Sequence, residues 1–354
     1  MVKERYAWLD YVRFFSIFLV IVFHTPPRLA TLDDAVILNL RVPVFFCVSG
    51  LLYSIDRWSV FWAYARHRAK QILVPYTTFF IIFYALWLVM GRAMVGPGEE
   101  AIPVLQPLWE FVLGNPNVVL KPFWYIACLF TMQMLYYGIE RLVGRRHVWA
   151  FAVSCVLAAG TYVVSEVWES WPWVHYVNDF WNLGNACLFL PFYALGNCFK
   201  TQLHAMSFKN ARTTVGMLLL AAASMAFMVL IAGLRDTTSP MGDPGLYNVL
   251  RDVAGMLVIP AYMCTAKWVA SKLGRRHVVE FVVVSGTVYL GVQNYLIGLC
   301  KVALTRFCYP TVIDDHIWLK LVIALVVMAA IYPVAVFIDR RCPWLIGKDH
   351  PYGR

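Results

Sequence analysis

Ten long hydrophobic stretches constrain the fold of this chain more than any other feature. Of its 354 residues, 61% are hydrophobic and 14% are charged, whereas soluble domains carry about 25% charged residues. A helix of about 20 apolar residues crosses a hydrocarbon core of about 30 Å, and each stretch is close to that length. The sequence therefore predicts an all-α polytopic membrane protein. The ten spans are predicted near residues 8–26, 36–55, 71–90, 123–140, 148–166, 181–199, 214–234, 247–266, 278–299 and 317–338.

The distribution of Lys and Arg supports an even number of spans. Ten spans place both termini on one side, and 20 of the 30 basic residues fall on that side against six on the other. The remaining four fall within spans or at their edges: Arg13, Arg41, Arg251 and Lys320. Because cytoplasmic loops carry the excess of Lys and Arg, we expect both termini in the cytoplasm. The net charge of +10 then reports topology, and nothing in the pattern favours nucleic-acid binding.

The connections between the spans suggest one membrane domain. We find no internal repeat and no low-complexity tract, so residues 1–354 are predicted to form a single domain without a soluble appendage. The longest connection, 91–122, contains the segment Trp109–Leu113, which is typical of an interfacial helix or a lid. The connection 167–180 is rich in aromatic residues. An aromatic belt at the membrane interface explains it, and sugar stacking is the alternative.

An arginine and a histidine lie within the first hydrophobic stretch. Arg13 and His24 are eleven residues apart, and at 100° per residue this spacing returns to within about 20° of the starting face of a helix. Asp10 falls on nearly the same face. The rise between Arg13 and His24 is about 16 Å, roughly half of a bilayer core. Ionisable groups at this depth are costly and functional by default, although a polar pair that locks helix packing is the alternative.

Further basic residues flank the second and third spans. Arg41 is predicted near the outer membrane edge, close to His24, where a snorkelling interfacial arginine is the alternative. Arg66 and Lys70 are four residues apart and share one face of a helix on the cytoplasmic side. That face suits either anionic lipid or the phosphates of a nucleotide-bearing donor.

Several polar residues in the apolar stretches have more than one interpretation. Ser49-Gly50 permits local backbone irregularity or close helix packing. Gln293 and Asn294 are expected to form hydrogen bonds inside the helix bundle. A carboxylate that orients His24 could come from the outer ends of spans five and six, and the sequence leaves three choices open: Glu166, Glu169 and Asp179.

Five segments, taken in order, form a recognisable series. They are Trp8-Leu9-Asp10-Tyr11-Val12-Arg13 with His24, Pro43-Val44-Phe45-Phe46 with Ser49-Gly50, Arg68 with Pro75-Tyr76, Phe123-Trp124-Tyr125, and Pro191-Phe192 with Gly196. The series resembles the acyltransferase family 3 membrane proteins over nearly the whole chain, and its Arg-x10-His element in a first transmembrane helix is fairly specific. Gln293 stands near the place where many members carry a Tyr-Leu-x-His ending, so the ninth span departs from that pattern.

The resemblance implies transfer of an acyl group, usually acetyl, from cytoplasmic acetyl-CoA to a hydroxyl of an extracytoplasmic glycan or lipid-linked sugar. A positioned histidine can take the proton of a hydroxyl that attacks an acyl carbon, which makes His24 the candidate base. Arg13 would hold the donor or stabilise an oxyanion, and Asp10 would pair with it. The CoA phosphates are expected at Arg66, Arg68 and Lys70. The acceptor is expected at Arg41, Trp124 and Tyr125.

The predicted setting is the cytoplasmic membrane of a bacterium, with acyl-CoA as a donor substrate and no permanently bound cofactor or metal. Two other classes stay open at this point. A transporter or flippase of a glycan or lipid precursor would also line its path with ionisable residues, and inverted repeats with broken helices would mark it. A non-catalytic membrane scaffold would tolerate the loss of His24.

Overall fold

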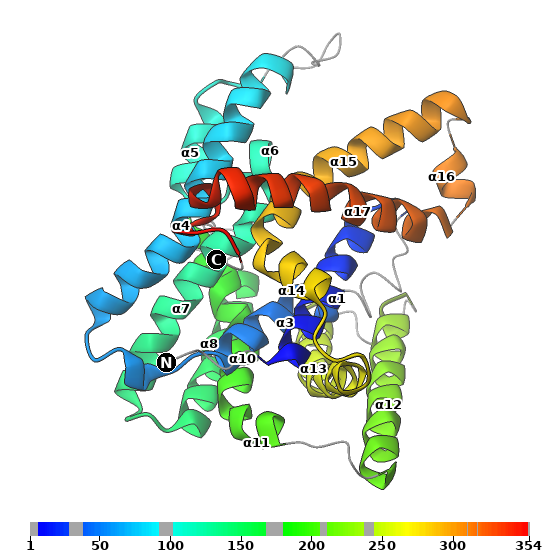
Figure 1. The fold of residues 1–354 in the computed structure, drawn as a ribbon. Coiled ribbons are helices and arrows are strands. Elements are labelled where there is room, and N and C mark those ends of the chain that lie inside the picture. Colours follow the sequence, from blue (N-terminus) through cyan, green and yellow to red (C-terminus); the bar gives the residue numbers. More distant parts are fainter. Residues whose placement is uncertain are drawn as a thin grey trace. The chain divides into compact units, whose positions relative to one another are not determined.

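The structure, a computed structural model, is built from helices, and its described part contains no strand (Figure 1). The described residues are 6–27, 38–91, 102–167, 180–205, 211–236, 244–309, 311–316 and 318–352. The prediction of an all-α membrane protein is confirmed.

The chain divides into two compact units, which we describe separately. Unit 1 consists of Met1–Tyr53 and Phe192–Ala335, and unit 2 consists of Ser54–Pro191 and Val336–Arg354. Two helices run through the division, α10 (Leu183–Cys198) and α17 (Trp318–Arg341). Each unit therefore combines segments that are far apart in the sequence.

Unit 1 is assembled around the first helix. Its helices are α1 (Ala7–His24), α3 (Leu38–Leu51), α11 (Lys200–Ala205), α12 (Ala211–Asp236), α13 (Pro244–Leu273), α14 (His277–Val284), α15 (Gly286–Phe307) and α16 (Val312–Asp315). Helix α1 packs against α3, α13, α14 and α15, and α12 packs along α13. Ten residues of α1 are buried, so this apolar helix is largely enclosed by its neighbours.

Unit 2 is assembled around α4 and α7. Its elements are η2 (Ile55–Arg57), α4 (Phe61–Leu86), the π-helical turn η3 (Trp87–Gly91), α5 (Gln106–Val112), α6 (Asn117–Leu120), η5 (Lys121–Phe123), α7 (Trp124–Leu142), α8 (His147–Val167), η6 (Phe180–Asn182) and η7 (Pro343–Ile346). Helix α4 packs against α7, and the C-terminal turn η7 packs against α4. The hydroxyl of Thr78 on α4 donates to the carbonyl of Leu345 at 2.6 Å, which fixes the C-terminal segment on this unit.

Seven helices among the described residues are long and apolar enough to cross a membrane. They are Ala7–His24, Phe61–Val89, Asn117–Leu142, His147–Val164, Val249–Leu273, Gly286–Phe307 and Trp318–Arg341. Two further apolar helices, Leu40–Leu51 and Thr214–Leu230, are shorter. The count of ten spans and the cytoplasmic termini therefore stay predictions.

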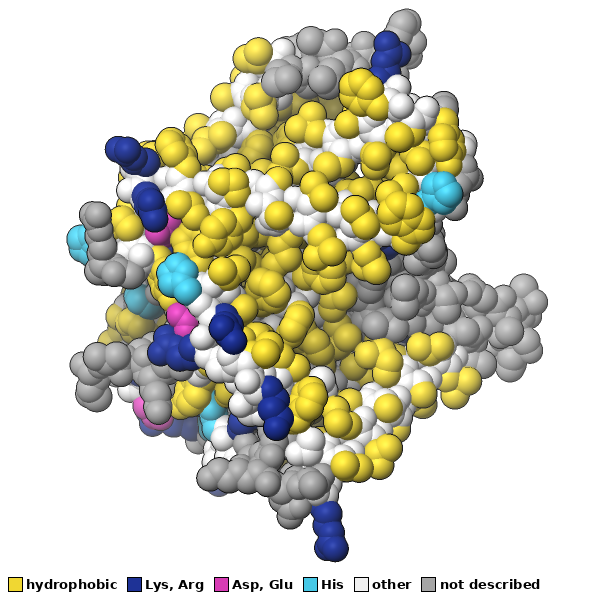
Figure 2. All heavy atoms as spheres, turned by 45° about the vertical axis from the view of Figure 1, so that its right-hand side comes forward, with side chains coloured by type: hydrophobic (Ala, Val, Ile, Leu, Met, Phe, Trp, Pro, Cys, Tyr) yellow, Lys and Arg dark blue, Asp and Glu magenta, His cyan; other side chains and the backbone are white. Residues whose placement is uncertain are grey.

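The surface of the long helices agrees with a membrane environment. On the face shown in Figure 2, hydrophobic side chains cover most of the surface, while Lys and Arg gather mainly toward its lower and left parts. Leu325 and Phe337 of α17 expose 57% and 63% of their surface, and Leu219 of α12 exposes 65%. Exposed apolar surface on this scale suits contact with lipid.

The ninth predicted span differs from the structure. The sequence predicts one helix over residues 278–299, whereas the structure has two helices that meet at Ser285. Ser285 has φ of −98° and ψ of 15°, outside helical values, and glycine follows it. Glycine allows the backbone to leave the helical conformation, and such an interruption of a membrane helix is tolerated where the backbone is enclosed by protein.

The structure tests one of the two long connections, 91–122, and describes little of the other, 167–180. The helix expected around Trp109–Leu113 is present as α5, and the hydroxyl of Tyr76 holds it through the Phe111 carbonyl at 3.0 Å. Its place at a membrane interface stays a prediction. Most of the aromatic connection, residues 168–179, lies outside the described residues.

Candidate functional site

Helix α1 positions three of the candidate residues. Its run from Ala7 to His24 has no proline or glycine and is apolar apart from a few polar residues, so it continues without interruption. Asp10 is buried, with 3% of its surface exposed, while Arg13 and His24 are half-buried. The helix ends at His24, and the backbone amide of Thr25 bonds the carbonyls of Ile21 and Val22. The expected stripe of Asp10, Arg13 and His24 thus lies on one continuous helix.

Arg41 lies beside the last turn of α1. Its guanidinium carbon is 3.6 Å from the centroid of the Phe23 ring, and that ring meets the His24 imidazole edge-on at 5.3 Å. Arg41 exposes 9% of its surface, which is less than a snorkelling arginine would expose. The structure therefore brings Arg41 next to the His24 end of α1, and its role toward an acceptor stays a prediction.

Lys320, a buried lysine, holds the turn after His24. The sequence alone does not indicate this role. The Lys320 ammonium, on α17, donates to the carbonyls of Thr25 at 2.6 Å and Pro27 at 2.8 Å. Lys320 exposes 2% of its surface. In the sequence, Lys320 is recognisable only as a lysine within a predicted span, where a charge is costly unless it is paired.

The three candidate cations for CoA phosphates lie on α4 in unit 2. Arg66 is exposed. Arg68 donates to the Gln71 side chain at 3.1 Å. Lys70 makes an ion pair with Asp349, with distances of 3.0 and 3.2 Å to the two carboxylate oxygens. The C-terminal segment thus already supplies an anion to one member of the expected phosphate site.

Trp124 and Tyr125, the other candidate acceptor residues, open α7 in unit 2. Both are half-buried, and the Trp124 ring lies 6.3 Å from the ring of Phe189. The site residues are therefore distributed over both units. Unit 1 contains the α1 residues and Arg41, and unit 2 contains the α4 and α7 residues.

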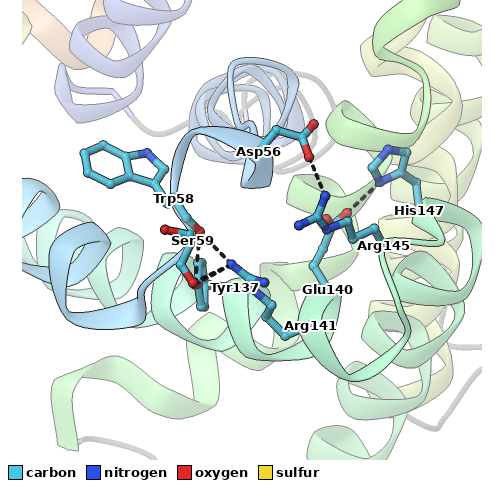
Figure 3. Close-up of polar contacts among 8 residues, drawn as sticks. All are labelled: Asp56, Trp58, Ser59, Tyr137, Glu140, Arg141, Arg145 and His147. Atoms are coloured by element: carbon cyan, nitrogen blue, oxygen red, sulfur yellow. Dashed lines mark hydrogen bonds and ion pairs between the residues drawn. The ribbon is translucent and has the colours of Figure 1, made fainter.

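A second polar cluster closes the end of α7 (Figure 3). Glu140 is fully buried, and its carboxylate meets the His147 Nδ1 at 2.6 Å. Arg141 donates to the carbonyls of Trp58 and Ser59 at 2.7 and 2.9 Å. These contacts join the start of α8 and the segment before α4 to one end of α7. The contacts of the cluster join three segments of unit 2, which indicates a structural role.

The bonds of Arg145 complete this cluster. Its side chain donates to the Asp56 carboxylate at 2.7 Å, and its backbone is left-handed with φ of 64°. Its amide also bonds the carbonyl of Glu140, so the residue both ends α7 and ties it to η2. From the sequence, Arg141 and Arg145 are interpreted only as basic residues that set the membrane topology.

Ser49-Gly50 and Gly196 serve close helix packing in unit 1. A Cβ added at Gly50 would lie 1.8 Å from the carbonyl oxygen of Tyr193, and one added at Gly196 would lie 1.9 Å from the carbonyl oxygen of Cys47. Helices α3 and α10 therefore pack with their backbones in direct contact at these two positions, which only glycine permits. Of the two interpretations that the sequence left open for Ser49-Gly50, close packing is the one observed at Gly50.

Three buried polar groups line one side of the region where α14 and α15 meet. Ser285, Tyr289 and Gln293 follow at intervals of four and expose at most 1% of their surface. Ser285 Oγ, Tyr289 Oη and Gln293 Nε2 have no hydrogen-bond partner among the described residues. The hydrogen bonds expected for Gln293 are thus missing at its Nε2 in this part of the chain. Each unmet buried group costs about 1–3 kcal/mol.

The comparison with protein families decides the class. A family model described as an acyltransferase domain matches residues 6–340 of the chain. The chain belongs to acyltransferase family 3. This match covers nearly the whole chain and confirms the resemblance carried by the sequence motifs. Comparison with curated proteins and with solved structures gave no match. As a member of family 3 with several membrane-length helices, the protein is a multi-pass membrane acyltransferase. The family match favours this class over a transporter or a non-catalytic scaffold.

Proposed function

We propose that this family 3 protein is an O-acyltransferase that moves an acyl group, in the first place acetyl, from cytoplasmic acyl-CoA to a hydroxyl of an extracytoplasmic glycan or lipid-linked sugar. The observation that carries the proposal is the position of Arg13 and His24 on one continuous helix, α1, with Arg13 in its first half and His24 as its last residue. The helical rise separates them by about 16 Å. A donor and an acceptor that arrive from opposite sides of a membrane need groups at two such depths.

In this proposal His24 is the general base. A sugar hydroxyl is a weak nucleophile near neutral pH, and a base that takes its proton during attack contributes about 10²–10⁴-fold in rate. The hydroxyl oxygen bonds to the acyl carbon, the thioester C–S bond breaks, and the CoA thiolate leaves. The proton stays on His24 until the thiolate or water takes it.

Arg13 and Asp10 serve the donor in this proposal. A guanidinium presents several N–H donors in a rigid plane, which suits the carbonyls of a pantetheine arm. Asp10, three residues earlier on α1, would balance the charge of Arg13.

The phosphates of CoA would meet the basic residues of α4. Arg66 is exposed and available to solvent, and the Lys70–Asp349 ion pair leaves 60% and 73% of the two side chains exposed. Exposed ion pairs contribute only about 0–1 kcal/mol, so a phosphate can replace Asp349 at little cost. Arg68 would add a second guanidinium to the same helix.

Each unit contributes candidate acceptor residues of its own, Arg41 in unit 1 and Trp124 and Tyr125 in unit 2. Arg41 offers hydrogen-bond donors beside the His24 end of α1, and the two aromatic rings suit stacking against a sugar. The expected location is the cytoplasmic membrane of a bacterium, where acyl-CoA and surface glycan precursors are on opposite sides.

The proposal is tested in a strain that lacks the gene and carries either the wild-type or the His24→Ala allele. Mass analysis of the surface glycans measures the acyl ester. We expect the ester to be lost with His24→Ala and retained with His350→Ala, which removes an exposed histidine near the C-terminus. Wild-type ester with His24→Ala, at normal protein levels in the membrane, would refute His24 as the base.

A further inference from the structure

Helix α13 packs against α1. The hydroxyl of Tyr262 donates to the Val12 carbonyl at 3.1 Å and lies 3.3 Å from the Ser16 hydroxyl. Five residues later on α13, the Lys267 ammonium lies 5.5 Å from the ring of Trp8. Higher numbers on α13 thus meet lower numbers on α1, which fixes both direction and register.

This register places Asp252 at the level of His24. Tyr262 contacts α1 between Val12 and Ser16. Ten residues from Tyr262 toward the start of α13 lead to Asp252, and ten residues from the middle of that contact toward the end of α1 lead to His24. Both steps correspond to about 15 Å along the helix axes.

Asp252 also lies on the side of α13 that faces α1. Asp252, Gly255, Ile259 and Tyr262 follow at intervals of three, four and three residues, which keeps them within about 80° around the helix. Asp252 exposes only 7% of its surface. A carboxylate is seldom buried so far unless it is paired.

The groups around this end of α1 are mostly cationic. Arg41 of α3 covers Phe23, Lys320 of α17 holds the Thr25 carbonyl, and Arg251 of α13 bonds the Asp252 carboxylate at 3.2 Å. Helix α14 carries Glu280 paired with Arg275, and α15 carries Tyr289. An imidazole that takes up a proton among three cations needs an opposing charge nearby.

We propose that Asp252 is the carboxylate that orients His24 and stabilises its imidazolium form, which assigns α13 a direct part in acyl transfer. The inference rests on the proposed role of His24 as base. A carboxylate that accepts from one imidazole nitrogen fixes the tautomer and turns the other nitrogen toward the acceptor hydroxyl. Arg251 and His24 can share the carboxylate, because it has two oxygens with several acceptor positions. Asp252 acts through His24 and is therefore a positioning residue.

The test uses inside-out membrane vesicles from the deletion strain that carry each allele, with radiolabelled acetyl-CoA as donor and the endogenous glycan precursors as acceptors. For Asp252→Asn we expect turnover to fall by about 100-fold, with a much smaller change in the KM for acetyl-CoA. The acidic limb of the pH–rate profile should move to lower pH, because a lost negative charge makes His24 easier to deprotonate. Asp252→Glu should recover part of the rate.

The matched control is Asp339→Asn. Asp339 is also buried, at 2% exposure, and also paired with a basic residue, Lys348, but it belongs to unit 2. This variant should keep the wild-type pH profile even where it lowers the amount of folded protein. Thermal unfolding of all variants separates a loss of folding from a loss of turnover.

The outcomes separate this inference from the proposed function. If His24→Ala is inactive and Asp252→Asn keeps wild-type turnover and pH profile, the assignment of Asp252 is overturned and His24 stands. A rate loss in Asp252→Asn that matches its loss of folded protein, with an unchanged pH profile, also overturns it. If wild-type vesicles transfer no label, the proposed donor and acceptor are wrong, and the role of Asp252 falls with them.

Discussion

Charged side chains are held in opposite ways at two places, on α13 and α17 of unit 1 and on α4 of unit 2. In unit 1, Lys320 and Asp252 expose 2% and 7% of their surface, and Lys320 is held by backbone carbonyls nearly 300 residues away in sequence. In unit 2, the side chains of Lys70 and Asp349 are 60% and 73% exposed. Breaking a buried charge pair is costly, whereas an exposed pair contributes about 0–1 kcal/mol. Unit 1 thus keeps its charges in fixed places, and the α4 charges of unit 2 can exchange partners.

Matched glycine substitutions should show the largest difference between the units. Gly50→Ala places a Cβ 1.8 Å from the Tyr193 carbonyl oxygen, whereas Gly138 on α7 has nothing within 4 Å. We expect Gly50→Ala to lower the free energy of unfolding by about 3 kcal/mol, because the Tyr193 backbone cannot move away from the added methyl group as a flexible side chain could. Gly138→Ala should be neutral or stabilising. Thermal unfolding in detergent measures both, and equal midpoints would contradict the backbone contact.

Lysine-to-methionine substitutions should show the next largest difference. Lys320→Met leaves two carbonyls without their donor, and we expect a loss of about 2 kcal/mol in the free energy of unfolding together with reduced acyl transfer. Lys70→Met should cost less than about 1 kcal/mol and should raise the KM for acyl-CoA instead. If the two variants unfold alike, the contrast between buried and exposed charge is wrong.

Arginine-to-lysine substitutions test geometry at constant charge. Arg13→Lys should lower acyl transfer at least about 10-fold, because lysine lacks the planar fork of donors. Arg66→Lys should change it less than about threefold, since a phosphate also accepts a point charge. Ester yield on the surface glycan is the measurement, and full activity of Arg13→Lys would show that Arg13 acts as a point charge.

Buried tyrosine hydroxyls should give the smallest effects, with opposite signs. Tyr289 Oη has no partner among the described residues, so Tyr289→Phe should raise the free energy of unfolding by about 1 kcal/mol. Tyr136 in unit 2 donates to Glu140 at 3.3 Å, so Tyr136→Phe should lower it by a similar amount. Unfolding midpoints that move in the same direction would argue against the assigned hydrogen bonds.

Much of the fold follows from local sequence, and the site only in part. Hydrophobic length predicts the membrane helices, and the period of 3.6 residues predicts the stripe of Asp10, Arg13 and His24, since both depend on neighbouring residues. The break at Ser285 was missed because an apolar stretch with Ser-Gly continues in many helices. Some of the ten predicted spans coincide with shorter apolar helices, such as Leu38–Leu51, so the span count stays a prediction.

The groups around His24 could not be found in the same way. The sequence offered Glu166, Glu169 and Asp179 as carboxylates; the last two lie outside the described residues, and the side chain of Glu166 does as well. Lys320 of α17 reaches the turn after His24, and the proposed place of Asp252 depends on the packing of α13 against α1. The register of helices so distant in sequence depends on the whole assembly, which local patterns do not encode.

The contact between Lys320 and the Thr25 turn also has a consequence for biogenesis. The first helix leaves the ribosome early, but the lysine that secures its end follows Thr25 by 295 residues. A nascent chain therefore carries His24 into the membrane long before Lys320 can hold the turn that follows it. A chain that ends before Lys320 would lack this contact at the end of α1.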